Sequence, residues 1–84
     1  GVSHINKKEG EVILSGGDNP TETNLYRLSL KNGELAVLTE GAGSHDGVFC
    51  KAGHVWVDKA SLPDGSVSTM LRARDGRPQR EIPS

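Results

Sequence analysis

Three residue types that could form a hydrolytic triad follow one another at Ser44, His45 and Asp46. Triad side chains must converge in space, but neighbouring residues of a strand point to opposite faces of a sheet. Ser44 also lacks the Gly-x-Ser-x-Gly context of a nucleophile at a strand-to-helix turn, because Ala42 and Asp46 take the glycine positions. We therefore predict no catalytic residue in this chain.

A second group of residues has the chemistry of zinc ligands, namely His45, Cys50 and His54 with Asp46 or Asp58. Structural zinc sites have paired ligands at short spacing, such as Cys-x-x-Cys. Here a single cysteine lies among residues of two predicted strands. We expect no metal, with His45 entering a strand, Cys50 forming a small buried thiol and His54 starting the next strand.

A glycine-rich segment contains Gly41, Gly43 and Gly47. It fails the dinucleotide fingerprint, because the third glycine position is Asp46 and no strand-turn-helix context surrounds it. We predict a flexible connector and no cofactor.

Four arginines form a local basic stretch near the C-terminal end: Arg72, Arg74, Arg77 and Arg80. Asp75 and Glu81 interrupt the stretch, and aromatic stacking partners for bases are missing. We therefore predict a solvated strand face and turn. The single tryptophan, Trp56, is predicted to pack in a core or between repeats.

The composition limits the chain to one small domain of 84 residues. A net charge of −1 provides no long-range attraction to nucleic acid or to an anionic membrane. The single cysteine excludes an intrachain disulfide and leaves the redox compartment undetermined.

An internal repeat organises these residues. Shifted by 43 residues the chain matches itself without a gap, and six positions are identical: Lys8 with Lys51, Gly10 with Gly53, Val12 with Val55, Pro20 with Pro63, Leu28 with Leu71 and Gly33 with Gly76. The matches fall on turn and strand positions. A period of about 40 to 50 residues built from strands is typical of a β-propeller blade.

The fold is therefore predicted to be all-β, with two four-stranded antiparallel β-propeller blades covering 1–41 and 42–84. The predicted strands of the two blades are 2–6, 11–16, 24–30 and 34–39, then 46–51, 54–59, 66–73 and 78–82. Pro20 and Pro63 are expected in connections, since proline cannot donate to a strand ladder.

Alternation and turn residues add local detail. Tyr26, Leu28 and Leu30 are predicted to share one strand face, opposite Arg27 and Ser29. A second set alternates in the same way, with Val67, Thr69 and Leu71 opposite Ser68, Met70 and Arg72. The pair at 32–33, Asn-Gly, predicts a tight hairpin with positive φ at both residues, and Asp-Gly at 75–76 predicts a second hairpin.

Three segments resemble the dipeptidyl peptidase IV-like family of serine peptidases. They are NPTETNLYRL at 19–28, LTEGAGSH at 38–45 and LRARDGR at 71–77. They are similar to that family's Pro-Thr-Glu loop before a Leu-Tyr strand, its Leu-Thr-x-x-x-Gly-x-His passage between blades and its Leu-Arg-x-x-Asp-Gly-Lys hairpin. Two departures stand at 23–24, where the family has Arg-His, and at 50–53, where it has Ser-Pro-Asp-Gly.

The resemblance implies a non-catalytic segment, the last blades of an N-terminal propeller. The parent enzyme would remove Xaa-Pro or Xaa-Ala dipeptides with a Ser-Asp-His triad on a separate α/β-hydrolase domain. The implied partners are that domain, the remaining blades and the parent's peptide substrate. A periplasmic or cell-surface location is implied in the same way.

An alternative from another class is a binding module from a propeller without a hydrolase domain. In either case two blades alone would leave apolar faces uncovered. The isolated chain is therefore expected to self-associate, with no nucleic-acid or membrane contact.

Overall fold

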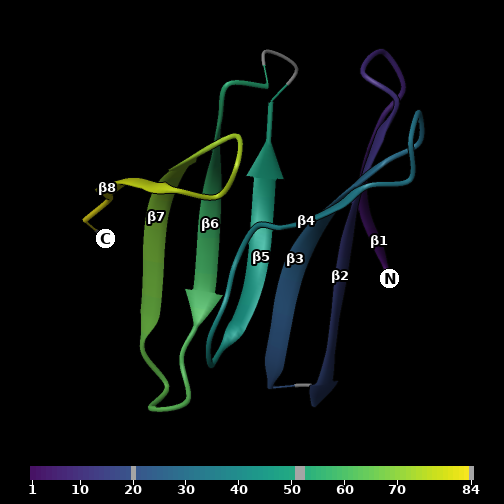
Figure 1. Cartoon of the computed structure of the whole chain (residues 1–84). Helices are drawn as coiled ribbons and strands as arrows, with labels where there is room; N and C mark the ends of the chain where they lie inside the picture. The colour runs from purple at the N-terminus through teal and green to yellow at the C-terminus, as the bar shows by residue number, and fades with distance from the viewer. Residues whose placement is uncertain (20, 51–52, 84) are drawn as a thin grey trace.

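The computed structural model describes residues 1–19, 21–50 and 53–83. Within them the chain forms eight β-strands (Figure 1). Their bounds are β1 Val2–Asn6, β2 Glu11–Asn19, β3 Glu22–Ser29, β4 Leu35–Val37, β5 Ser44–Phe49, β6 Val55–Ser61, β7 Val67–Ala73 and β8 Pro78–Glu81. The all-β prediction is confirmed, and every predicted strand has a counterpart.

Two strands differ most from their predicted lengths. β2 continues to Asn19, whereas β4 is limited to Leu35–Val37. The described residues contain no helix that could cross a membrane. Pro63 lies in the β6–β7 connection as predicted, and Pro20 lies outside the described residues.

The strands form one open mixed sheet with two antiparallel halves. β1, β2, β3 and β4 pair in chain order and make the N-terminal unit, and β5, β6, β7 and β8 do the same in the C-terminal unit. A single parallel pair, Thr23 with Ser44, links the two units. The side-by-side course of β3 and β5 is visible in Figure 1.

The strand ladders of the two units correspond at an offset of 44 residues, not at the 43 of the sequence match. The row Ile5, Val12, Leu28 and Leu35 runs across the N-terminal unit. Moved on by 44, its first three members fall on the paired row Phe49, Trp56 and Arg72. A change of one residue reverses the face of a strand. The sequence match therefore pairs residues whose places in the two units differ.

A second row shows the same offset. His4, Ile13, Arg27 and Ala36 run across the opposite face of the N-terminal unit. Moved on by 44, they fall on the row Val48, Val57, Leu71 and Arg80.

The buried apolar core lies between the units. It consists of Ile13, Leu25 and Leu38 from the N-terminal unit and Trp56 from the C-terminal unit, with Phe49 packed against them. The Phe49 ring is stacked between His4, at a centroid distance of 5.5 Å, and Trp56, at 4.9 Å. The facing surfaces of the units are called the inner faces below, and their opposite surfaces the outer faces.

One face of β3 is buried against the core, and the other face lies on the outside of the N-terminal unit. Leu25 is 1% exposed on the inner face, and Arg27 shares that face with it. Tyr26 and Leu28 do share a face, as predicted, but it is the outer one. The alternation of residue types identified the two faces of β3, but it could not predict which of them the other unit covers.

Two glycines permit the close approach of the units. A Cβ on Gly47 would collide with the Phe49 ring of its own strand, at 2.5 Å, and would lie 3.1 Å from Leu25 Cδ1 of the other unit, and a Cβ on Gly76 would collide with the Leu38 carbonyl oxygen. Gly76 also has φ 96°, in the region that favours glycine. The β7–β8 turn can therefore rest on the end of the N-terminal unit.

The turn at 32–33 differs from the predicted tight hairpin. Gly33 has φ 75°, but the positive φ values of the described residues belong to glycines alone, so Asn32 does not share the conformation. The Asn32 side chain instead accepts a hydrogen bond from Glu34 N at 2.9 Å. A wider loop results, closed by Ser29 N donating to the Glu34 carbonyl oxygen.

Candidate functional site

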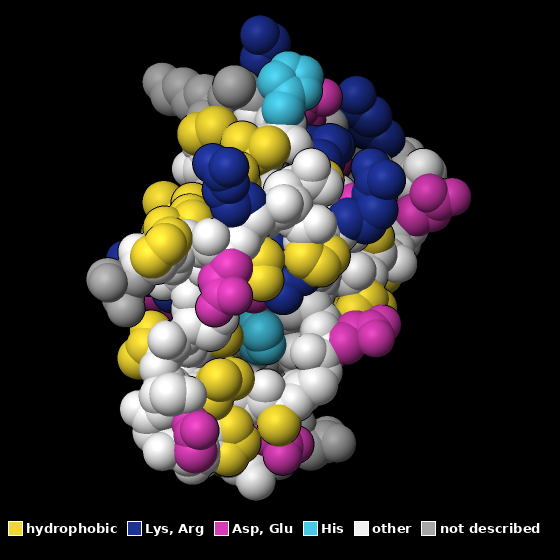
Figure 2. All heavy atoms as spheres, turned by 90° about the vertical axis from the view of Figure 1, so that its left-hand side faces the viewer, with side chains coloured by type: hydrophobic (Ala, Val, Ile, Leu, Met, Phe, Trp, Pro, Cys, Tyr) yellow, Lys and Arg dark blue, Asp and Glu magenta, His cyan; other side chains and the backbone are white. Residues whose placement is uncertain are grey.

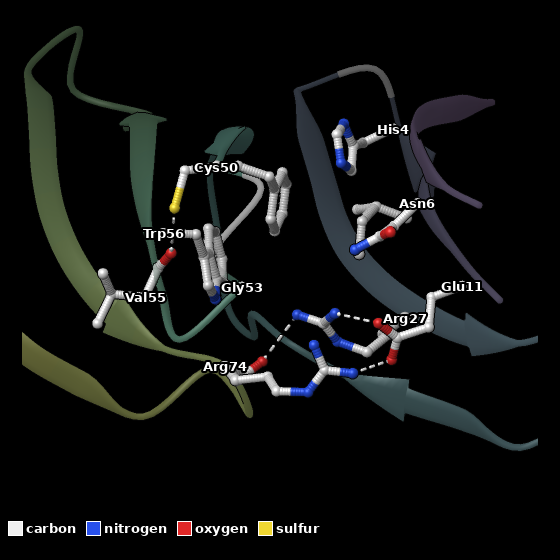
Figure 3. A pocket seen from close by; sticks show the side chains of 11 residues that line it. His4, Asn6, Glu11, Arg27, Cys50, Gly53, Val55, Trp56 and Arg74 are labelled. Atoms are coloured by element: carbon white, nitrogen blue, oxygen red, sulfur yellow. Dashed lines mark hydrogen bonds and ion pairs between the residues drawn. The ribbon is translucent and has the colours of Figure 1, made fainter. Parts of the chain in front are cut away.

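The first polar cluster lies where the two inner faces meet (Figure 3). Glu11 begins β2 and receives a hydrogen bond from Arg27 Nη1 on β3, at 3.2 Å. Arg74, which follows β7, binds the other carboxylate oxygen of Glu11 through Nη2. Arg27 Nη2 in turn donates to the Arg74 carbonyl oxygen at 3.0 Å. These three residues therefore join the N-terminal unit to the C-terminal unit.

The electrostatics of this cluster favour the charged forms of Glu11 and Arg74 and oppose that of Arg27. The hydrogen bond from Arg74 lowers the pKa of Glu11, against an opposing effect of burial and with further help from Arg27. Burial lowers the pKa of Arg27, and the nearby Arg74 acts in the same direction. The hydrogen bond with Glu11 raises the pKa of Arg74. A carboxylate held ionised by two guanidinium groups is a poor proton donor at neutral pH.

A small hollow adjoins this cluster. Its apolar side is formed by Ile13, Phe49 and Trp56, and its polar side by Glu11 and Arg27. Figure 3 shows the aromatic rings and the arginines converging on it from both units. Because its carboxylate and both guanidinium groups are bound to one another, we interpret the hollow as a joint between units.

The second polar cluster lies within the C-terminal unit. Asp58, on β6, is 1% exposed. It lies 2.8 Å from His45 Nδ1 on β5 and receives a hydrogen bond of 2.9 Å from Arg72 Nε on β7. Arg72 also donates to the Gly76 carbonyl oxygen at 2.8 Å, so the cluster holds three strands and the β7–β8 turn in place.

The contacts of His45 in this cluster show whether the contiguous Ser44, His45 and Asp46 could act together as a triad. His45 is buried and Asp46 is exposed, so the two point to opposite faces, as expected for neighbours in a strand. The carboxylate partner of His45 is Asp58, and the His45 Nε2 is buried with no hydrogen-bond partner among the described residues. The part of the chain that the structure describes therefore assembles no triad around His45.

The zinc-like residues are also separated. His45 and Asp58 are in contact, whereas Cys50 and His54 are exposed. Among the described residues no group of three histidine, cysteine or acidic side chains could hold a metal ion. The expectation that Cys50 is buried was wrong, because Cys50 follows Phe49, the last residue of β5, and lies outside the core that Phe49 contacts.

The arginine stretch was only partly solvated. Arg77 pairs with Asp75 at the surface, but the Arg72 side chain is only 17% exposed and Arg74 is bound to Glu11. The prediction of a solvated face was therefore wrong for Arg72, whereas the Arg74 side chain is 43% exposed although it is bound to Glu11. Trp56 is buried between the units as predicted, and its Nε1 donates to the Ala73 carbonyl oxygen at 2.8 Å.

Sequence reasoning missed Glu11 and Arg27 altogether and gave Asp58 no partner apart from a metal. A charged residue inside a strand pattern normally indicates a solvent face. The available signal was that Glu11 and Arg27 lie on the same strand faces as Ile13 and Leu25. No protein-family model matches this chain, and no curated protein matches it either.

Proposed function

We propose that this chain is a pair of neighbouring β-propeller blades from the wall of a dipeptidyl peptidase IV-like serine exopeptidase, acting as scaffold and not as catalyst. The observation that carries the proposal is the packing of its two four-stranded units. The 44-residue offset relates the outer face of the N-terminal unit to the inner face of the C-terminal unit. Successive blades of a propeller are related in this head-to-tail sense.

Contacts along the joint support the same arrangement. His4 on β1 stacks on Phe49 of β5, and Leu38, just after β4, lies under Gly76 of the β7–β8 turn. The first strands of the two units therefore meet through a ring contact, and the segment after β4 meets the turn before β8. Two sheets stacked in the same strand order have this pattern.

The family part of the proposal depends on the three sequence segments that resemble the peptidases. Several of their residues hold the units in place. Thr39 Oγ1 accepts a hydrogen bond from Leu25 N at 3.0 Å, and His45 and Arg72 both bind Asp58. A scaffold role accounts for these residues without assigning any of them to chemistry.

The test is the activity of the complete gene product compared with that of the 84-residue chain. We expect the complete protein to release dipeptides from an Ala-Pro reporter, and an active-site serine probe to label a residue outside this segment. We expect the 84-residue chain alone to release none. A complete protein that consists of further blades, with no Gly-x-Ser-x-Gly segment and no dipeptide release, would instead favour the binding-module alternative.

A further inference from the structure

Each unit carries an apolar outer face. On the N-terminal unit, the paired rows place these side chains together: Ile5, Val12, Leu14, Tyr26, Leu28, Leu35 and Val37. On the C-terminal unit the corresponding set is Val48, Val55, Val57, Val67, Thr69 and Leu71. Ile5 is 55% exposed and Val48 is 54% exposed. Figure 2 shows hydrophobic side chains at the surface on the side of the molecule where β7 and β8 lie.

The contact inside the chain is a template for what these faces can bind. The inner row His4 and Ile13 packs against the inner row Phe49 and Trp56. At the 44-residue offset, His4 and Ile13 correspond to Val48 and Val57 on the outer face of the C-terminal unit. Phe49 and Trp56 likewise correspond to Ile5 and Val12 on the outer face of the N-terminal unit. The two outer faces therefore occupy the same ladder positions as the two halves of the internal contact, with aliphatic side chains in place of its aromatic rings.

We propose that the outer face of the C-terminal unit binds the outer face of the N-terminal unit of a second copy of this chain. The same register places Val48 against Ile5, Val57 against Val12 and Leu71 against Leu28 of the next copy. This inference rests on the blade-like stacking proposed above.

The chemistry of the two faces favours a second copy as the occupant. The N-terminal face has no charged side chain in its two paired rows, and Asp46 and Lys59 of the C-terminal face stand opposite each other in the sheet. Val48, Val57 and Leu71 meet the apolar Ile5, Val12 and Leu28, and the charged Arg80 continues the same C-terminal row beyond Leu71. Because the two faces differ, the contact is heterologous, and it either closes into a ring or continues as a filament.

Complementation between two blocked variants tests the proposal. Ile5→Asp blocks the N-terminal face and Val48→Asp blocks the C-terminal face, and light scattering gives the mass of each alone and of an equimolar mixture. We expect the unmodified chain to form oligomers, each variant to be monomeric, and the mixture to form a dimer through the two intact faces. The matched control Asn32→Asp, in the β3–β4 turn, should assemble like the unmodified chain.

A crosslinking experiment covers the case in which an aspartate prevents folding. In a Cys50→Ser background, Ile5→Cys and Val48→Cys chains are mixed and treated with a thiol crosslinker of about 10 Å reach, which matches the spacing of packed sheets. We expect a crosslinked heterodimer from this mixture and none when Asn32→Cys replaces Ile5→Cys.

A monomeric unmodified chain at high concentration, with no crosslinked heterodimer, would overturn the inference. The same reagent applied to a chain with both His4→Cys and Phe49→Cys tests the internal stacking separately. If that internal crosslink forms while the intermolecular one does not, self-stacking is wrong and the blade-like arrangement stands. If neither forms, the blade-like arrangement fails as well.

Discussion

Asp58 and Glu11 are both buried carboxylates that bind two partners each, yet they stabilise different parts of the molecule. Asp58 binds His45 and Arg72 and so connects strands within the C-terminal unit. Glu11 binds Arg27 of its own unit and Arg74 of the other. One cluster therefore maintains a unit and the other joins two units. Substitutions in the two clusters should consequently differ in how much stability they remove and in which contacts they break.

The largest effect is expected at Asp58. Asp58→Ala leaves His45 and Arg72 buried without their acceptor, and removing one partner of a buried ion pair costs about 3 to 5 kcal/mol. Urea unfolding followed by tryptophan fluorescence measures the change. The exposed neighbour Asp46→Ala is the matched control and should change little. Equal losses for both variants would show that the buried cluster does not maintain the unit.

A smaller effect is expected at the Gly76 turn. Gly76→Ala combines a positive φ with a collision against the Leu38 carbonyl oxygen of the other unit, and we expect a loss of about 1 to 3 kcal/mol. Gly33→Ala is the matched control in the N-terminal unit, because its φ is also positive but no atom lies within 4 Å of the added Cβ. Thermal unfolding of the two variants should rank Gly76→Ala as the less stable. The reverse ranking would contradict the contact between units.

Glu11→Gln should cost about 1 to 2 kcal/mol, because Arg74 is partly exposed and its ion pair is screened by water. The effect should depend on pH. The pKa of Glu11 in the folded chain lies below its ordinary 4.5, so the stabilisation is present above that value and is lost as pH falls through the folded pKa. Unfolding of both proteins at neutral and acid pH measures the difference. A difference that does not shrink in acid would exclude the ionised carboxylate as its source.

The smallest effect is expected at Arg77. Its ion pair with Asp75 lies at the surface, with the two side chains 76% and 60% exposed. We expect Arg77→Ala to leave the urea midpoint unchanged, since exposed pairs contribute little. A clear loss would mean that the β7–β8 turn depends on this pair as well as on Arg72.

The sequence was sufficient to predict an all-β chain of eight strands and the approximate bounds of each strand. Alternation and turn residues are local signals, and β3 and β7 follow them closely. The correspondence between the strand pairings of the two units could not be predicted. The 43-residue match depends on turn glycines, Gly10 with Gly53 and Gly33 with Gly76, and these do not specify how the strands pair. The ladders correspond at 44 residues, and this one-residue difference determines which face of each unit is covered.

The candidate site was less predictable than the fold. Arg72, Arg74 and Glu11 had the appearance of surface residues because a charge in a strand usually faces water. The contacts that these residues make join distant parts of the chain, as between Glu11 and Arg74, and a local pattern does not indicate them. Trp56 was predictable, since a large aromatic in an apolar strand has few other places to lie.

The most direct test of the stacked units uses the single phenylalanine and the single tryptophan of the chain. Their ring protons can be assigned without ambiguity in a proton NMR spectrum, and isotope filtering restricts the signals to contacts within one chain. The stacked arrangement predicts nuclear Overhauser effects from the Phe49 ring to both the Trp56 ring and the His4 ring. Effects to Trp56 without any to His4 would contradict the stacking, because of these two ring contacts it is the one with His4 that crosses from one unit to the other.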